Sequence, residues 1–114
     1  YTVPCGAAVS AEGSWAMAKG VGFNMAYTVN FENATVDYDL ARGDDALKIF
    51  EPDKEPQVLK LKAGDGYTGQ ITHLVESIQA GSAPSIVTAQ DGLTSIELCE
   101  AAKRSIGAGE RVTV

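Results

Sequence analysis

Three glycines in the middle of the chain, Gly64, Gly66 and Gly69, have the G-x-G-x-x-G spacing of a dinucleotide-binding loop. Such glycines let the backbone approach a pyrophosphate that sits at the N-terminus of a helix. A strand-like segment precedes them and a helical pattern follows. Asp91 lies about twenty residues further on, where such sites place the acid that binds the ribose. These residues could therefore hold NAD or a related nucleotide.

Three observations favour a structural role for this glycine-rich turn instead. Lys60 and Lys62 interrupt the preceding segment, whereas the central parallel strand of a nucleotide-binding fold is apolar on both faces. Asp65 would bring a negative charge into the phosphate cradle. Asp91 is better placed to cap a helix, and only residues 86–87 are left to form a second parallel strand. We expect a Gly-Asp-Gly turn that opens a helix, with nucleotide binding as the alternative.

The other side chains that could do chemistry lack partners close by in the sequence. His73, the only histidine, falls on the polar side of a helical pattern, so we expect it to face solvent or an interface. Cys5 and Cys99 form no C-x-x-C pair, which favours reduced thiols in a cytoplasmic protein. We expect Cys99 to pack as a small apolar residue.

Two further groups of residues have a structural explanation. Trp15, Phe23 and Tyr27 could stack on a ligand, but their spacing predicts core packing. A set of acidic residues matches no calcium-binding loop and is expected to be solvated. No catalytic, cofactor-binding or metal-ligating residue is therefore predicted in this chain. The acidic set is Glu32, Asp37, Asp39, Asp44 and Asp45.

The composition indicates an ordinary globular protein of 114 residues. Nine basic and fifteen acidic residues give a net charge of −6, which argues against nucleic acid as a partner. No apolar run approaches the ~20 residues of a membrane span, and the sequence pattern leads us to expect no secretory leader. The chain opens at Tyr1 directly with strand-like sequence, so we expect a piece of a longer cytoplasmic polypeptide.

The first half of the chain has the period of β-strands. Residues 23–31 and 34–40 alternate between apolar and polar, and Glu32 and Asn33 supply a turn, which together predict a hairpin. Further strands and turns are expected on both sides of this hairpin. The strands are expected at 9–17, 47–50 and 58–61, and the turns at 42–45 and 52–56.

The second half of the chain is predicted to be helical. The apolar residues from Tyr67 to Ile78 follow one helix face, and Gly81 suits the position just after its C-terminus. Residues 86–87 should form a short extended link. A variant of the capping box at 88–91 should start a second helix that reaches about Ser105.

The second predicted helix has a stripe of small and apolar residues, which we expect to be buried. Residues 107–109 should end the helix, and 111–114 should form a final edge strand. The stripe consists of Gly92, Ile96, Cys99, Ala102 and Ile106.

Strands followed by helices predict an α+β fold, in which helices cover one face of a mostly antiparallel sheet. The other face would be open, with Ala26, Thr28, Asn30 and Ala41 among its residues. This mixture suits burial against a partner or a twin subunit. We therefore expect a homo-oligomer that associates through the open sheet face.

From about Glu12 to Val114 the chain resembles the C-terminal domain of the Gfo/Idh/MocA oxidoreductase family, which includes glucose-fructose oxidoreductase and inositol dehydrogenase. The likeness rests on residues 23–39, then 66–81 with Pro84, and then 88–105 with a glycine-containing tail. In that family an N-terminal nucleotide domain precedes a large, mostly antiparallel sheet with helices on one face. The open face of this sheet often forms the dimer interface.

The resemblance implies a parent enzyme that uses NAD or NADP to oxidise a sugar, inositol or related polyol, or to reduce the matching ketone. The family's glycine motif, its Glu-Lys-Pro segment with the catalytic lysine, and its substrate-facing Asp/His helix all lie upstream of the matching region. Residues 1–114 are therefore expected to be a single C-terminal substrate and oligomerisation domain that lacks the nucleotide-binding domain and is inactive alone.

Two other functions stay open. The chain could be a small nucleotide-binding protein that uses Gly64, Gly66 and Gly69. It could also be a non-enzymatic interaction module that descends from the enzyme domain.

Overall fold

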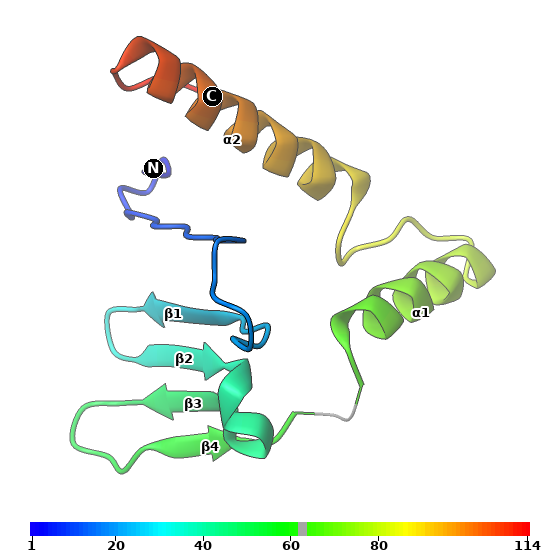
Figure 1. The fold of residues 1–114 in the computed structure, drawn as a ribbon. Helices are drawn as coiled ribbons and strands as arrows, with labels where there is room; N and C mark the ends of the chain where they lie inside the picture. Colours follow the sequence, from blue (N-terminus) through cyan, green and yellow to red (C-terminus); the bar gives the residue numbers. More distant parts are fainter. Residues whose placement is uncertain (62–63) are drawn as a thin grey trace. The chain divides into compact units, whose positions relative to one another are not determined.

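The alternating segments of the first half pair into a four-stranded antiparallel sheet (Figure 1). This computed structural model describes residues 1–61 and 64–114. The chain divides into two units, Tyr1–Leu61, here the sheet unit, and Lys62–Val114, here the helical unit. The predicted α+β class and antiparallel sheet are confirmed. That helices cover one face of the sheet, and that the chain is a single domain, stay predictions.

The sheet is a meander in which each strand pairs with the next along the chain. The predicted hairpin is confirmed: Tyr27 pairs with Tyr38, and the Phe31 N–H donates to the Ala34 carbonyl at 2.8 Å to close the turn. The strand predicted at 47–50 is also confirmed. The strands are β1 (Ala26–Asn30), β2 (Thr35–Asp39), β3 (Leu47–Phe50) and β4 (Gln57–Leu59).

The turn predicted at 42–45 is a 3-10 stretch, η1 (Leu40–Asp45), that connects β2 to β3. The Asp39 carboxylate accepts from the Ala41 N–H at 2.9 Å and so caps the start of η1. Gly43 has φ 59° and ψ −124°, the dihedral pair of the first central residue of a type II′ turn, which only glycine adopts readily. This residue lets the chain reverse direction within six residues.

Strand pairing sorts the side chains onto two chemically different faces, because directly paired residues point to the same side of a sheet. On the face that we call the apolar face, the rings of Tyr27 and Tyr38 stack with centroids 5.2 Å apart. The apolar face carries Tyr27, Val29, Val36, Tyr38, Leu47, Ile49 and Leu59, together with one polar residue, Gln57. The opposite, polar face carries Ala26, Thr28, Asn30, Thr35, Asp37, Asp39, Lys48, Phe50 and Val58.

The strand predicted at 9–17 is wrong. Within the described residues, pairing near the N-terminus is limited to an isolated bridge between Thr2 and Ala8, and Trp15 is fully exposed. Alanine, serine and glycine dominate this segment, and they have little β propensity. A strand without a neighbouring strand also forms no ladder hydrogen bonds, so its backbone groups bond to water, and the extended conformation is not stabilised.

The helical unit consists of α1 (Gly66–Gln79) and α2 (Ala89–Ala108) (Figure 1). The predicted C-terminal glycine of the first helix is confirmed. The Gly81 N–H donates to the Ile78 carbonyl at 3.0 Å and the Ser82 N–H to the Ser77 carbonyl at 2.9 Å. These two bonds form a Schellman motif, with Gly81 at φ 65°. No helix among the described residues has both the length and the apolar character needed to cross a membrane.

Two of the segments predicted around the second helix, 86–87 and 111–114, are wrong, whereas the predicted end of that helix is confirmed. The helix α2 ends at Ala108 with Gly109 in the left-handed conformation, so the end predicted at 107–109 is confirmed, although the helix runs three residues past the approximate limit of Ser105. Val87 has φ 53°, so residues 86–87 form a bend instead of an extended link. No strand forms at 111–114, where the described residues offer no pairing partner.

Within the helical unit the stripe of α2 that was predicted to be buried is exposed, and so is the apolar face of α1. Ile71 is 58% exposed and Ile106 is 83% exposed, whereas the buried helical residues are Ser77 and Ala101. The periodicity correctly located the helices, but it identifies which residues are apolar rather than what covers them. Cys99, predicted to pack as an apolar residue, is exposed as well.

Alanine substitutions at Gly107 and Gly109 should have opposite effects on stability, because Gly107 lies inside α2 and Gly109 ends it. Gly109→Ala should lower the free energy of unfolding of the helical unit by about 1 kcal/mol, because Gly109 has φ 71° and ψ 19°. Gly107→Ala should raise it by about 0.5–1 kcal/mol, since Gly107 lies inside α2. Urea unfolding followed by the helical circular-dichroism signal measures both. Equal effects of the two substitutions would contradict the observed helix end.

Candidate functional site

The glycine-rich turn holds a helix cap where a nucleotide site would hold phosphate. The Asp65 carboxylate accepts from the Thr68 N–H at 2.8 Å and from the Thr68 hydroxyl at 2.9 Å. These bonds, the backbone one foremost, lower the pKa of Asp65 and keep it ionised. A fixed negative charge at the N-terminus of α1 competes with any phosphate for the same amides. The preceding strand, β4, also lies at the edge of an antiparallel sheet.

Asp91, the candidate ribose ligand, is part of the cap of α2. Its carboxylate accepts from the Thr88 N–H at 2.7 Å, and its own N–H donates to the Thr88 hydroxyl at 3.2 Å. The Thr88 amide lowers the pKa of Asp91, because it stabilises the ionised form. The predicted capping box is therefore confirmed. The structure gives Gly64, Gly66, Gly69 and Asp91 local roles in two separate helix starts.

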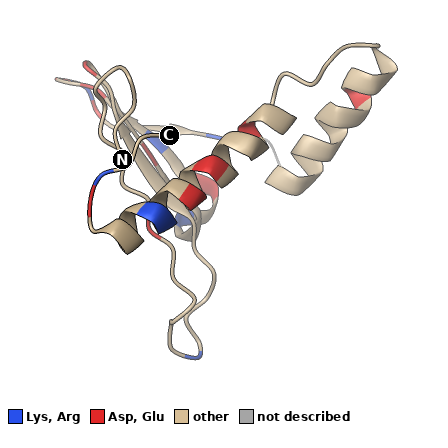
Figure 2. Ribbon diagram, turned by 90° about the horizontal axis from the view of Figure 1, so that it is seen from above, with Lys and Arg blue, Asp and Glu red and all other residues tan. Residues whose placement is uncertain are grey.

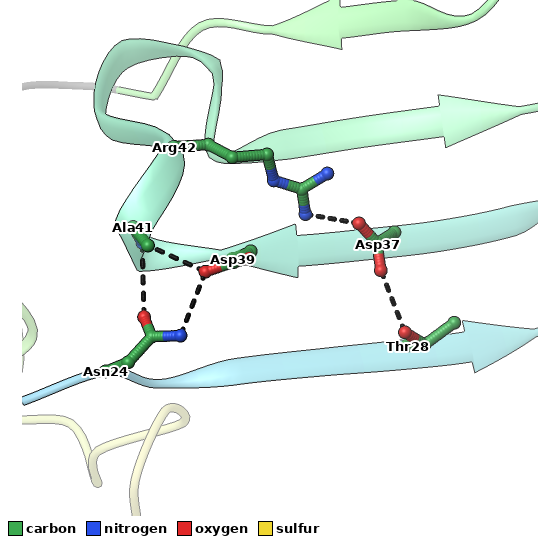
Figure 3. A network of polar contacts seen from close by, with 6 residues as sticks. All are labelled: Asn24, Thr28, Asp37, Asp39, Ala41 and Arg42. Atoms are coloured by element: carbon green, nitrogen blue, oxygen red, sulfur yellow. Dashed lines mark hydrogen bonds and ion pairs between the residues drawn. The ribbon is translucent and has the colours of Figure 1, made fainter.

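The densest cluster of polar side chains lies on the polar face of the sheet, beside η1 (Figure 3). The Arg42 guanidinium forms an ion pair with Asp37, whose other carboxylate oxygen accepts from the Thr28 hydroxyl at 2.8 Å. Next to it, the Asn24 amide donates to the Asp39 carboxylate at 3.1 Å. This network ties β1 and β2 to η1, although the buried Nε of Arg42 has no hydrogen-bond partner among the described residues.

Several charged side chains of this unit are paired with one another. Hydrogen bonds from Arg42 and then Thr28 lower the pKa of Asp37. The hydrogen bond between Lys60 and Asp45, 2.7 Å long, lowers the pKa of Asp45 and raises that of Lys60. Three carboxylates of the predicted acidic set, those of Asp37, Asp39 and Asp45, are therefore engaged by side chains of the same unit. Within the described ranges, no three His, Cys, Asp or Glu side chains converge as metal ligands.

Along α2 the acidic residues come before the basic ones (Figure 2), and Lys103 donates to Glu100 at 2.9 Å where the two groups meet. A shallow depression of about 350 Å³ lies in the sheet unit, between the β1–β2 turn and the end of β3. Its lining includes Phe31 and Phe50 together with the carboxylates of Glu32 and Glu51, and no histidine, cysteine or lysine. This depression has no nucleophile paired with a base, so it offers no arrangement for covalent or acid–base catalysis.

His73 has a role that the sequence did not reveal. Whether it faces solvent or an interface stays a prediction; the structure shows His73 half-buried and bonded to the loop that follows α1. Its Nε2 accepts from the Ser85 N–H at 3.0 Å and from the Ile86 N–H at 3.2 Å. Helical periodicity could not reveal this contact, because both donors are backbone groups of an irregular segment. The imidazole therefore fixes the course of the loop between α1 and α2.

Acid should weaken the sheet unit through Asp37. Its pKa in the folded chain lies below the ordinary 3.8, so its stabilising contribution is complete above pH 3.8 and is lost as the pH falls through the lowered value. Asp37→Asn should destabilise the unit at neutral pH and make its stability less dependent on pH below 3.8. Urea unfolding across this range measures both effects.

Glu55→Gln is the control for Asp37→Asn, since Glu55 makes no side-chain hydrogen bond in the part of the chain that the structure describes. It should leave both the stability at neutral pH and the acid dependence as they are. An acid dependence that is as steep in Asp37→Asn as in the unmodified chain would show that other carboxylates, such as that of Asp45, carry it.

The described residues thus form two capped helices and a sheet with one polar and one apolar face, and no three His, Cys, Asp or Glu side chains converge among them. Comparisons with protein-family models, curated proteins and solved structures find no match to this chain.

Proposed function

We propose that the chain is the sheet-bearing C-terminal domain of an NAD(P)-dependent oxidoreductase that acts on a sugar, inositol or related polyol. Its role there is that of a scaffold, which supports the substrate site and the subunit contact while the nucleotide and the catalytic lysine belong to an N-terminal domain. The domain works in the cytoplasm, where Cys5 and Cys99 stay reduced.

The observation that supports this proposal best is that the carboxylates on the polar face of the sheet are bound by side chains of the same unit. On the polar face, Asp37 and Asp39 have partners in Arg42 and Asn24. On the apolar face, Tyr27 is 49% exposed. Exposed apolar side chains grouped on one face are typical of a surface that contacts another protein layer. A sheet of this kind suits contact with other protein layers better than it suits turnover of a small molecule. The resemblance of residues 23–39, 66–81 and 88–105 supplies the enzyme class.

The test compares the isolated chain with a longer polypeptide in which the segment encoded before Tyr1 is included. We expect that segment to encode a nucleotide-binding domain. The longer polypeptide should reduce NAD or NADP in the presence of at least one member of a panel of aldoses, inositols and other polyols. Residues 1–114 alone should show no turnover. Absence of an encoded nucleotide domain would contradict the proposal and favour a non-enzymatic interaction module.

Titration of NADH into residues 1–114 separates the proposal from the small nucleotide-binding protein. We expect no saturable change in NADH fluorescence, because Asp65 holds the N-terminal amides of α1. Asp65→Asn serves as the matched variant. It removes the negative charge that competes with phosphate at the N-terminus of α1 and keeps a side chain that can cap the helix. Saturable micromolar binding by the unmodified chain, lost when Gly66 is replaced by valine, would favour the nucleotide-binding alternative.

The proposal includes a homo-oligomer that forms through the polar face. Phe50 lies on that face at the end of β3 and is 38% exposed. Phe50→Arg should therefore weaken an association between polar faces, measured by light scattering after size exclusion. An oligomer that is unaffected by Phe50→Arg would indicate that a different surface forms the contact.

A further inference from the structure

The two edges of the sheet differ in their protection against pairing with another strand. The edge strand β4 has three residues, with Pro56 directly before it and Lys60 directly after it. Short length, proline and lysine are the usual devices that keep an exposed edge from pairing. The other edge strand, β1, has five residues, and residues 20–31 contain no charged residue and no proline. The β1 edge therefore lacks every one of these devices.

The backbone of β1 presents free hydrogen-bonding groups at alternate residues. The Leu40 N–H donates to the Met25 carbonyl at 3.0 Å and the Phe31 N–H to the Ala34 carbonyl at 2.8 Å. The odd-numbered residues of β1 therefore bond to β2, and the backbone groups of Ala26, Thr28 and Asn30 point away from the sheet. Within residues 1–61 and 64–114, no backbone group pairs with this outer side of β1.

The sequence of β1 is complementary to itself. If two copies of β1 pair in antiparallel fashion about Thr28, Thr28 lies opposite the same residue of the second copy, and Ala26 lies opposite Asn30. Each of these pairs exchanges both backbone hydrogen bonds. Tyr27 then lies opposite Val29, an aromatic and β-branched pair that stabilises neighbouring strands. No like charges meet, because residues 20–31 carry none.

We propose that the β1 edge is a homodimerisation surface, on which β1 of a second copy pairs antiparallel about a two-fold axis at Thr28. This surface differs from the polar face named in the proposed function and does not depend on the enzyme class. The pairing extends the sheet across two copies and sets both apolar faces on the same side, since the axis is perpendicular to the sheet. Tyr27 and Val29 of each copy then continue one apolar surface.

A single strand pair is a small interface, so the dimer is weak and depends on concentration. The first measurement is hydrogen exchange by NMR on residues 1–114 at micromolar and at near-millimolar concentration. The amides of Thr28 and Asn30 should gain about tenfold protection or more at high concentration. Those of Tyr27 and Val29 should be protected at both concentrations, because they bond to β2. The outward amide of Val58 on β4 should stay unprotected throughout.

The second measurement is sedimentation velocity on matched proline variants. Ala26→Pro removes an outward N–H and leaves the bonds between β1 and β2 in place. It should abolish the dimer while the circular-dichroism spectrum of the sheet stays unchanged. Val58→Pro removes an outward N–H from the opposite edge, and the dimer should persist.

Three results would overturn the inference. The first is a chain that stays monomeric at near-millimolar concentration. The second is a dimer in which the amides of Thr28 and Asn30 exchange as fast as in the monomer. The third is a dimer that Ala26→Pro leaves intact and Phe50→Arg disrupts, which would assign the contact to the polar face and support that part of the proposed function instead.

Discussion

Replacing Gly43 with alanine should lower the free energy of unfolding of the sheet unit by about 1–3 kcal/mol. Gly43 has φ 59° and ψ −124°, which an L-residue with a Cβ adopts only at a cost in backbone energy. An alanine Cβ would meet no atom within 4 Å at this position, so the loss comes from the backbone and not from a clash. Urea unfolding followed by the tyrosine circular-dichroism signal measures it.

Gly22→Ala is the matched control for Gly43→Ala. Gly22 lies in the same unit, a Cβ there also meets nothing within 4 Å, and its φ is not in the left-handed region. Alanine should therefore leave the stability unchanged or raise it by up to about 0.5 kcal/mol, because it restricts the unfolded chain. If both substitutions cost the same, the turn at Gly43 does not have the backbone described here.

Ala46→Leu should destabilise the sheet unit by about 1–3 kcal/mol through overpacking. Ala46 is 4% exposed, and both of its backbone groups are bonded. Its N–H donates to the Gly43 carbonyl at 3.1 Å, and its carbonyl accepts from the Asp39 N–H at 2.9 Å. The backbone therefore has no freedom to move aside for a larger side chain, and strain should pass into η1 and the start of β3.

Ala41→Leu is the control for overpacking, because Ala41 lies in η1 but is exposed. Its effect should stay within about 0.5 kcal/mol of zero. Thermal unfolding of both variants gives the comparison. A tolerated Ala46→Leu would mean that the space around Ala46 can expand, which its bonded backbone argues against.

The elements that could be predicted from the sequence are those whose signal is local. Alternation placed the hairpin at 23–31 and 34–40, and turn residues placed its reversal at Glu32 and Asn33. The capping box at Thr88 was correct because both of its bonds join residues three apart. In each case the partners lie within one element or in neighbouring elements, so spacing alone carries the information.

The features that could not be predicted depend on contacts between irregular segments. His73 accepts hydrogen bonds from the backbone N–H groups of Ser85 and Ile86. Every residue except proline has such a donor, so the residue types gave no sign of this contact. Val87 takes φ 53° although it is β-branched, against its own preference. The strand predicted at 9–17 fails for the related reason that a strand needs a partner, and apolar spacing does not supply one.

Strict alternation along β1 also determines which kinds of mutation this strand tolerates. A substitution at Thr28 alters one side chain, but loss of a single codon before it would shift the rest of the strand by one position. Tyr27 and Val29 would then turn toward the side now held by Asp37 and Lys48, and Thr28 would turn toward Tyr38. This strand should accordingly tolerate many point mutations and almost no in-frame single-residue deletion.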